Sequence, residues 1–167
     1  MQTQTEPYSP WQNRCESTIK ELKKETLRLM NKTRTPKVLW DYCISYVAER
    51  MSMTASDLYA LHGRTPHELV TGFTPDISEL IDFAWYDPLW FYTDVSFPQD
   101  KRELGRWLGI AHRVGQALCY WILTPSGTVV ARSTVQPLTE EERKTQNIQN
   151  IIQDFDKKVN EKFKHNL

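Results

Sequence analysis

The sequence is poor in the residues that build several common kinds of site. It has only three cysteines, which lie far apart and form no CxxC pair: Cys15, Cys43 and Cys119. An odd number of widely spaced cysteines argues against a disulfide framework, and no Cys/His cluster indicates zinc. Its six glycines form no glycine-rich phosphate loop, because those of residues 105–115 lie in a strand-like region without a following helix.

The sequence also lacks net charge, since 21 basic residues balance 21 acidic ones. This balance argues against a protein that coats nucleic acid, because phosphate binding needs an excess of lysine and arginine. The average hides a local difference, however. Residues 81–100 carry four aspartates and no basic residue, whereas residues 101–136 carry five basic residues against Glu103 alone. We therefore expect a modest basic surface on the second half of the chain.

Long hydrophobic runs are missing as well. No apolar stretch approaches the roughly 18–20 residues that a membrane-spanning helix needs. Residues 1–10 contain no basic segment followed by an apolar one, so they do not resemble a signal peptide. These absences, together with cysteines that are expected to remain reduced thiols, lead us to expect an intracellular protein without a membrane partner.

Apolar and aromatic residues are present in the amounts typical of a folded protein, 40% and 11%. Three helices are predicted in the first half. The first spans about residues 16–30, with Ile19, Leu22, Thr26 and Met30 on one face. Thr35 is predicted to cap the second, with Pro36 in its first turn and an apolar stripe of Leu39, Tyr42, Cys43, Tyr46, Val47 and Arg50.

The third helix is short. Thr65 and Glu68 have the spacing of a capping box, and Gly72 is expected to end the helix. Thr74-Pro75 repeats the Thr-Pro start and predicts one more turn.

After residue 82 the pattern changes to aromatic and β-branched segments separated by proline and glycine. Five strands are predicted, and the last two form a β-hairpin around a four-residue turn: 83–86, 89–92, 105–111, 118–123 and 128–133. Five short strands in so few residues predict a small SH3-like antiparallel β-barrel. Residues 139–167 then predict an amphipathic helix with the stripe Ile148, Ile152, Phe155, Val159 and Phe163. The predicted fold class is therefore α+β, with units at 1–80, 81–138 and 139–167.

One segment carries a specific motif. Residues 6–16 read Glu-Pro-Tyr-Ser-Pro-Trp-Gln-Asn-Arg-Cys-Glu and run directly into the first helix. This segment resembles the third catalytic block of retroviral and retrotransposon integrases, in which a Pro-Tyr-Ser-Pro-x-Gln-Asn loop precedes a helix-borne glutamate. On that resemblance Tyr8, Ser9, Pro10, Gln12 and Asn13 match the loop, and Glu16 matches the last acid of the Asp-Asp-Glu triad.

Later segments extend the resemblance in the same order. Residues 62–69 and 72–76 resemble the HGxTPxE and GxTPD region that follows the integrase core in Ty1/copia-type polyproteins, and residues 105–124 resemble the small β-domain after it. The likeness covers residues 6 to about 138. It implies a helical remnant of an RNase-H-like integrase core, an SH3-like β-domain, and DNA integration in the nucleus.

The resemblance also implies a metal site, but an incomplete one in this chain. Integrase chemistry uses two Mg²⁺ or Mn²⁺ ions bridged by carboxylates, and Glu16 is the predicted catalytic and metal-binding residue. The family's two aspartates precede the glutamate, yet no aspartate occurs here before Asp41. We therefore expect no metal bound by this chain and no strand transfer by it alone. Taken only as a glutamate in a first helical turn, Glu16 is better explained by the helix dipole; the preceding loop favours the metal-binding interpretation.

Nucleic-acid contacts are predicted in two places. Tyr8, Ser9, Gln12 and Asn13 lie in the loop that the resemblance places over a bound strand. In the β-domain the predicted contacts are arginines that alternate with aromatic residues: Arg106, Arg113 and Arg132. The aromatic belt itself, which is Trp85, Tyr86, Trp90, Phe91, Tyr92, Trp107, Tyr120 and Trp121, has two interpretations. It is either the β-domain core or a surface on which bases or a peptide stack.

Two further hypotheses concern partners. The first helix normally packs on a sheet that is not encoded here, so its apolar stripe, with Leu27 and Leu29, or the tail helix could mediate self-association. The alternative to an integrase fragment is a non-enzymatic SH3-like protein-interaction module with a docking helix.

Overall fold

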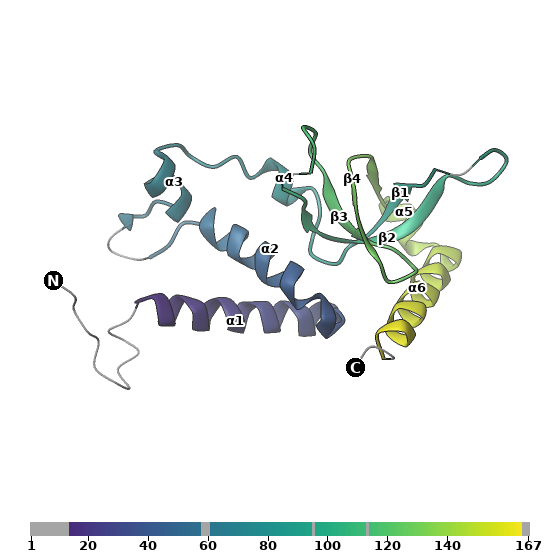
Figure 1. The fold of residues 1–167 in the computed structure, drawn as a ribbon, viewed down its shortest axis with the longest axis horizontal. Coiled ribbons are helices and arrows are strands. Elements are labelled where there is room, and N and C mark those ends of the chain that lie inside the picture. Colours follow the sequence, from purple (N-terminus) through teal and green to yellow (C-terminus); the bar gives the residue numbers. More distant parts are fainter. Residues whose placement is uncertain (1–13, 58–60, 95, 113, 165–167) are drawn as a thin grey trace.

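The computed structural model describes residues 14–57, 61–94, 96–112 and 114–164. Its helices are α1 (Arg14–Thr33), α2 (Trp40–Ser52), α3 (Pro66–Thr71), α4 (Ser78–Ile81), α5 (Glu140–Lys144) and α6 (Gln146–Lys164), and a 3₁₀ turn, η2 (Lys37–Leu39), precedes α2. Its strands are β1 (Pro88–Tyr92), β2 (Arg102–Ile110), β3 (Tyr120–Leu123), β4 (Val129–Arg132) and β5 (Val135–Pro137). The α+β class is confirmed (Figure 1).

Helices α1 and α2 form the predicted helical pair. The stripe on α1 is confirmed at Thr26 and Met30, which are buried, whereas Ile19 near the start of the helix is 50% exposed. The predicted cap of the second helix is wrong. Thr35 makes no cap hydrogen bond; its hydroxyl instead accepts from the buried indole N–H of Trp85 at 3.0 Å. The Thr35 hydroxyl therefore bonds a side chain fifty residues away in the chain and not the backbone N–H groups of the next helix.

Helices α3 and α4 are short and carry no buried residue. Thr65 caps α3 by accepting from the backbone N–H of Glu68, and Gly72 ends the helix in the left-handed conformation at φ 78°, both as predicted. The other half of the capping box is absent, because the Glu68 carboxylate accepts from the Thr74 hydroxyl. The next turn begins at Ser78, where the Asp76 carboxylate accepts from the Ser78 backbone N–H.

The five strands form one antiparallel sheet with the order β4-β3-β2-β1-β5. The predicted closed barrel is wrong: β4 and β5 are the two edges, so the sheet stays open. The β3–β4 hairpin is confirmed. Residues 83–86 form no strand; they carry Phe83, Trp85 and Tyr86 into the core, and Tyr86 has a left-handed φ of 65°. The strand that sequence patterns missed is β5, which returns to pair with β1.

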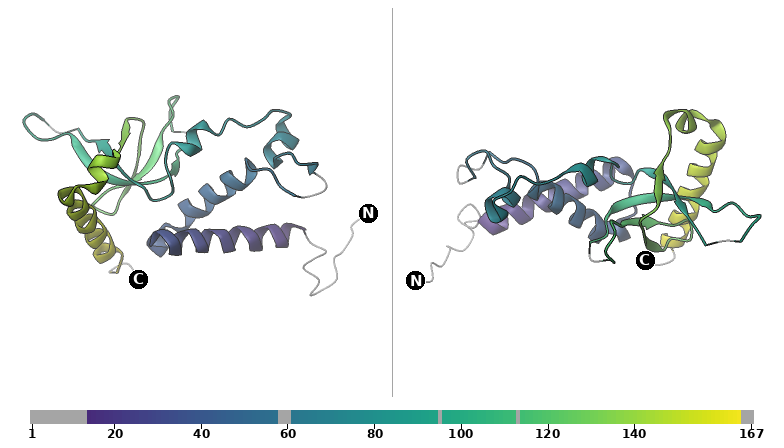
Figure 2. Two further views of the ribbon diagram at one scale, coloured as in Figure 1. Left: turned by 180° about the vertical axis from the view of Figure 1, so that it is seen from behind. Right: turned by 90° about the horizontal axis from the view of Figure 1, so that it is seen from above.

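The sheet is covered on both faces, and β2 shows how. Successive residues of a strand point to opposite faces. Trp107 packs edge-on against Tyr46 of α2, while its neighbour Arg106 reaches Asp156 of α6. Figures 1 and 2 accordingly show the α1–α2 pair and α6 on either side of the sheet. On the α2 side Gly105 is required, because a Cβ there would lie 2.5 Å from the Ile122 side chain.

The predicted tail helix is present, and it docks on the sheet through its apolar stripe. Phe155 and Val159 are buried, and Lys162 donates to the carbonyl of Ser126 in the β3–β4 turn. A complete capping box at Thr139, unnoticed in the sequence, starts the preceding α5. The predicted division into three units stays a prediction. No helix within the described ranges is long and apolar enough to span a bilayer.

Candidate nucleic-acid interface

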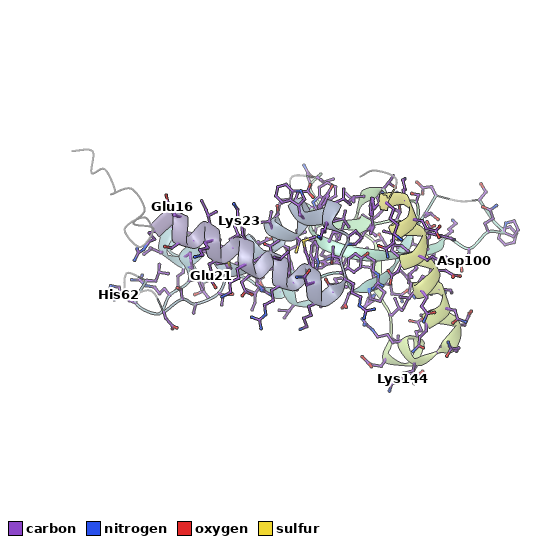
Figure 3. The ribbon with its side chains drawn as sticks, turned by 90° about the horizontal axis from the view of Figure 1, so that it is seen from below. Glu16, Glu21, Lys23, His62, Asp100 and Lys144 are labelled. Atoms are coloured by element: carbon purple, nitrogen blue, oxygen red, sulfur yellow. The ribbon has the colours of Figure 1, made fainter. Side chains whose placement is uncertain are left out.

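Glu16 lies in the first turn of α1 and is exposed. A carboxylate in this position is stabilised by the positive end of the helix dipole. Figures 1 and 3 place it at the end of α1 that points away from the sheet. The predicted loop contacts Tyr8, Ser9, Gln12 and Asn13 lie outside the described residues, as does Arg113.

The described residues do not complete a two-metal centre. Such a centre needs several carboxylates around the ions. In the part of the chain that the structure describes, no group of three or more His, Cys, Asp or Glu side chains could hold a metal ion. Glu16 is the predicted metal ligand, and among the described residues no second and third ligand accompany it.

Behind Glu16, α1 presents a line of basic side chains that sequence reasoning missed. Lys20, Lys24 and Arg28 follow Glu16 at intervals of four residues, and all three are exposed. Side chains four apart are neighbours along a helix, and here they lie outside the buried side of α1, which carries Thr26 and Met30. The spacing is visible in the sequence, but glutamates alternate with these cations along the helix and the net charge is zero. We call Lys20, Lys24 and Arg28 the basic stripe.

Arg106 is held inside the fold. Its side chain is 11% exposed, and its guanidinium donates two hydrogen bonds to Asp156, at 2.9 and 2.7 Å, and one to the carbonyl of Tyr86. The same guanidinium lies 4.8 Å from the centre of the Tyr86 ring. A phosphate contact by Arg106 would have to break this arrangement, so the residue's evident role is to fasten α6 to β2.

Arg132 stands at the end of the edge strand β4 and is exposed, with its guanidinium donating to the carbonyl of Ala131. It is therefore accessible to a phosphate. The structure does not bring it together with Glu16, which lies at the far end of α1 (Figure 3). The predicted arginine contacts of the β-domain stay predictions.

The aromatic belt is mostly core. Trp85, Tyr86, Phe91, Trp107 and Tyr120 are buried, which confirms the packing interpretation for these five. Tyr92 is 41% exposed, and Trp90 and Trp121 are half-buried, so a stacking surface is restricted to these three.

The thiol of Cys43 is not a nucleophile. The residue is fully buried, and burial raises the pKa of its thiol to about 12. A thiol reacts as its thiolate, which is scarce so far below the pKa. Burial likewise raises the pKa of Tyr46 and Tyr86.

No protein-family model, curated protein or solved structure matches this chain. The integrase resemblance therefore stays a prediction from the sequence motifs.

Proposed function

We propose that this chain is part of a Ty1/copia-type retrotransposon integrase and contributes DNA binding to integration. The observation that carries the proposal is the arrangement on α1. Glu16, which the motif assigns to phosphodiester chemistry, is exposed at the start of the helix, and the basic stripe follows it at intervals of four residues, all of them exposed. The three cations suit a bound phosphate backbone, because cations neutralise phosphates and release their counterions. Arg28 is exposed although it also pairs with Glu25 of the same helix at 3.6 Å.

The finer fold is part of the same proposal. In it, α1 and α2 derive from the end of an RNase-H-like core and residues 81–138 form an SH3-like β-domain. The return of β5 to the first strand and the short hairpin strands support this assignment, although the sheet is open. Arg132 on β4 adds a weaker DNA contact, and the nucleus is the expected site of action.

This chain alone is not expected to join DNA strands, because it supplies one of the three acids. The test is incubation of the purified chain with a DNA duplex and Mg²⁺ or Mn²⁺, followed by gel analysis of nicking and strand transfer. Metal-dependent nicking that disappears in Glu16→Gln would contradict the incomplete-triad part of the proposal.

DNA binding itself is tested by the salt dependence of fluorescence anisotropy with a short duplex. Each neutralised phosphate contributes about −0.9 to the slope of log K against log salt. Replacing Lys20, Lys24 and Arg28 together by glutamine should make the slope shallower by about 2–3. The matched control is the glutamine variant of Lys157, Lys158 and Lys164, three exposed lysines of α6. A slope near zero for the unmodified chain, or equal losses in the two variants, would sink the DNA proposal.

The second candidate is a non-enzymatic SH3-like interaction module. The docking of α6 onto its own sheet through Arg106 and Asp156 favours a self-contained folded unit. Absence of DNA binding together with saturable binding of a peptide or protein would favour this candidate.

A further inference from the structure

A groove of about 460 Å³ lies between α2 and the bulged end of β2, away from the basic stripe. It exists because β2 changes register between Trp107 and Ile110, where Gly109 adopts a φ of 103°. The bulge lets the backbone approach α2, and a Cβ on Gly109 would lie 3.7 Å from the Cβ of Tyr46. A volume of this size accommodates a long side chain and part of its backbone.

One wall of the groove is acidic. Asp41, Ser45 and Glu49 recur every four residues and line the groove from α2. Asp41 is exposed, whereas the side chain of Glu49 is only 17% exposed. Across the groove His112 lies 2.7 Å from a carboxylate oxygen of Glu49, and it marks the rim at the end of β2. Among the described residues that line the groove there is no lysine or arginine.

Three aromatic side chains also line the groove, two from α2 and one from β3. Tyr42 and Trp121 meet edge to face, with ring centres 5.7 Å apart and planes at 70°, and both are half-buried. Tyr46 stacks on Trp85, and its ring already has the guanidinium of Arg50 5.8 Å from its centre, so the rings left for a ligand are those of Tyr42 and Trp121. Burial, and then the negative charge of Asp41, raise the pKa of Tyr42.

These walls select a cation. The electron-rich face of an aromatic ring attracts an ammonium or guanidinium group, and more strongly when water is partly excluded. The exposed carboxylate of Asp41 adds charge complementarity and disfavours a phosphate, and that of Glu49, which contacts His112, adds to the negative charge. We propose that the groove binds a lysine or arginine side chain carried by a peptide segment of a partner protein. The proposal does not depend on DNA binding, since the groove and the basic stripe carry opposite charge.

The experiment is NMR titration of the full, ¹⁵N-labelled chain with the capped peptide Gly-Gly-Lys-Gly-Gly and its arginine counterpart. The expected result is a saturable shift of the Trp121 indole signal and of the amides of α2 residues 41–49. The norleucine peptide, which keeps most of the aliphatic stem and lacks the charge, should give no saturable shift. A short DNA duplex should leave these signals in place.

Variants test the assignment. Asp41→Asn with Glu49→Gln should weaken binding of the lysine peptide by about tenfold or more. The matched control is Glu79→Gln with Asp82→Asn, which removes the same charge from exposed acids elsewhere and should leave affinity unchanged. Ser45→Lys, at an exposed position on the groove wall, should place a tethered ammonium in the groove and block the peptide. Preserved dispersion of the tryptophan indole signals verifies folding of each variant.

Several results would overturn the proposal. Equal shifts with the norleucine peptide would make the groove a merely apolar surface, and shifts with DNA would make it a nucleic-acid contact. If the Asp41→Asn, Glu49→Gln variant and its control bind the lysine peptide with equal affinity, the two carboxylates do not take part in recognition. Movement of the Trp121 signal with protein concentration alone would identify the occupant as a second copy of this chain.

Discussion

The sheet and the segment that leads into it use apolar side chains in opposite ways. In the sheet Leu89, Trp107 and Ile122 are completely buried between α2 and α6. In the α3–α4 segment Val70 and Phe73 are 85% and 76% exposed (Figure 1). Both regions are apolar in sequence, so composition does not explain the difference.

The difference lies in the length of the elements and in what covers them. A nine-residue strand paired on both sides presents a continuous face that a long helix can cover. Helices of six and four residues offer no such stripe, and their ends expose backbone to water. Burial in this protein therefore follows the layering of long elements rather than local hydrophobicity.

The largest expected effect is at the centre of the sheet. Trp107→Ala should lower the free energy of unfolding by about 3–5 kcal/mol, because it leaves a cavity beneath Tyr46, Phe83 and Tyr120. Phe73→Ala, the matched aromatic truncation in the α3–α4 segment, should change it by less than about 0.5 kcal/mol. Urea unfolding followed by circular dichroism measures both. Similar losses of unfolding free energy in the two variants would contradict the proposed difference between the sheet and the α3–α4 segment.

The fastening of α6 comes next. Arg106→Ala should cost about 2–3 kcal/mol, because it removes the paired hydrogen bonds to Asp156, a carboxylate that is itself 38% exposed. Arg102→Ala, on the same face of β2 but exposed over Trp90, should cost less than about 1 kcal/mol. Hydrogen exchange should show faster opening of α6 in the first variant only. Unchanged exchange in α6 would mean that Phe155 and Val159 hold the helix without the ion pair.

Alkaline pH should weaken the buried layer. The thiol of Cys43 has a pKa of about 12 in the folded chain, against 9.0 for a free thiol. Between these values the unfolded chain has lost a proton that the folded chain keeps, so stability falls as pH rises. One such group contributes about 1.4 kcal/mol per pH unit. Chemical denaturation at pH values from about 8 to 11 should give a shallower decline for Cys43→Ala than for the unmodified chain, and identical declines would contradict the burial of this thiol.

The smallest effect concerns the two halves of α1. Residues 14–21 are all exposed, whereas Thr26 and Met30 are buried against α2. Amides of residues 27–33 should therefore exchange more slowly than those of residues 18–22, by about tenfold. Equally rapid exchange along the whole helix would show that α1 does not stay packed on α2.

Periodic patterns in the sequence predicted those helices and strands whose formation depends mainly on residues close by in the chain. The stripes of α1, α2 and α6, the β3–β4 hairpin and the stop at Gly72 all follow from local spacing and are present. The candidate site was predicted only in part. Glu16 is exposed at a helix start as the motif implied, but the basic stripe was missed and Arg106 proved to be committed to Asp156.

By itself, then, the sequence determined where helices and strands can form and which of their faces are apolar, because both depend on neighbours within a few residues. Tertiary structure decided the rest. Thr35 bonds Trp85 instead of capping α2, residues 83–86 enter the core without forming a strand, and β5 pairs with β1. Each outcome depends on a group distant in the chain, and the free energy of burying and pairing such groups exceeds the local preferences that sequence patterns record.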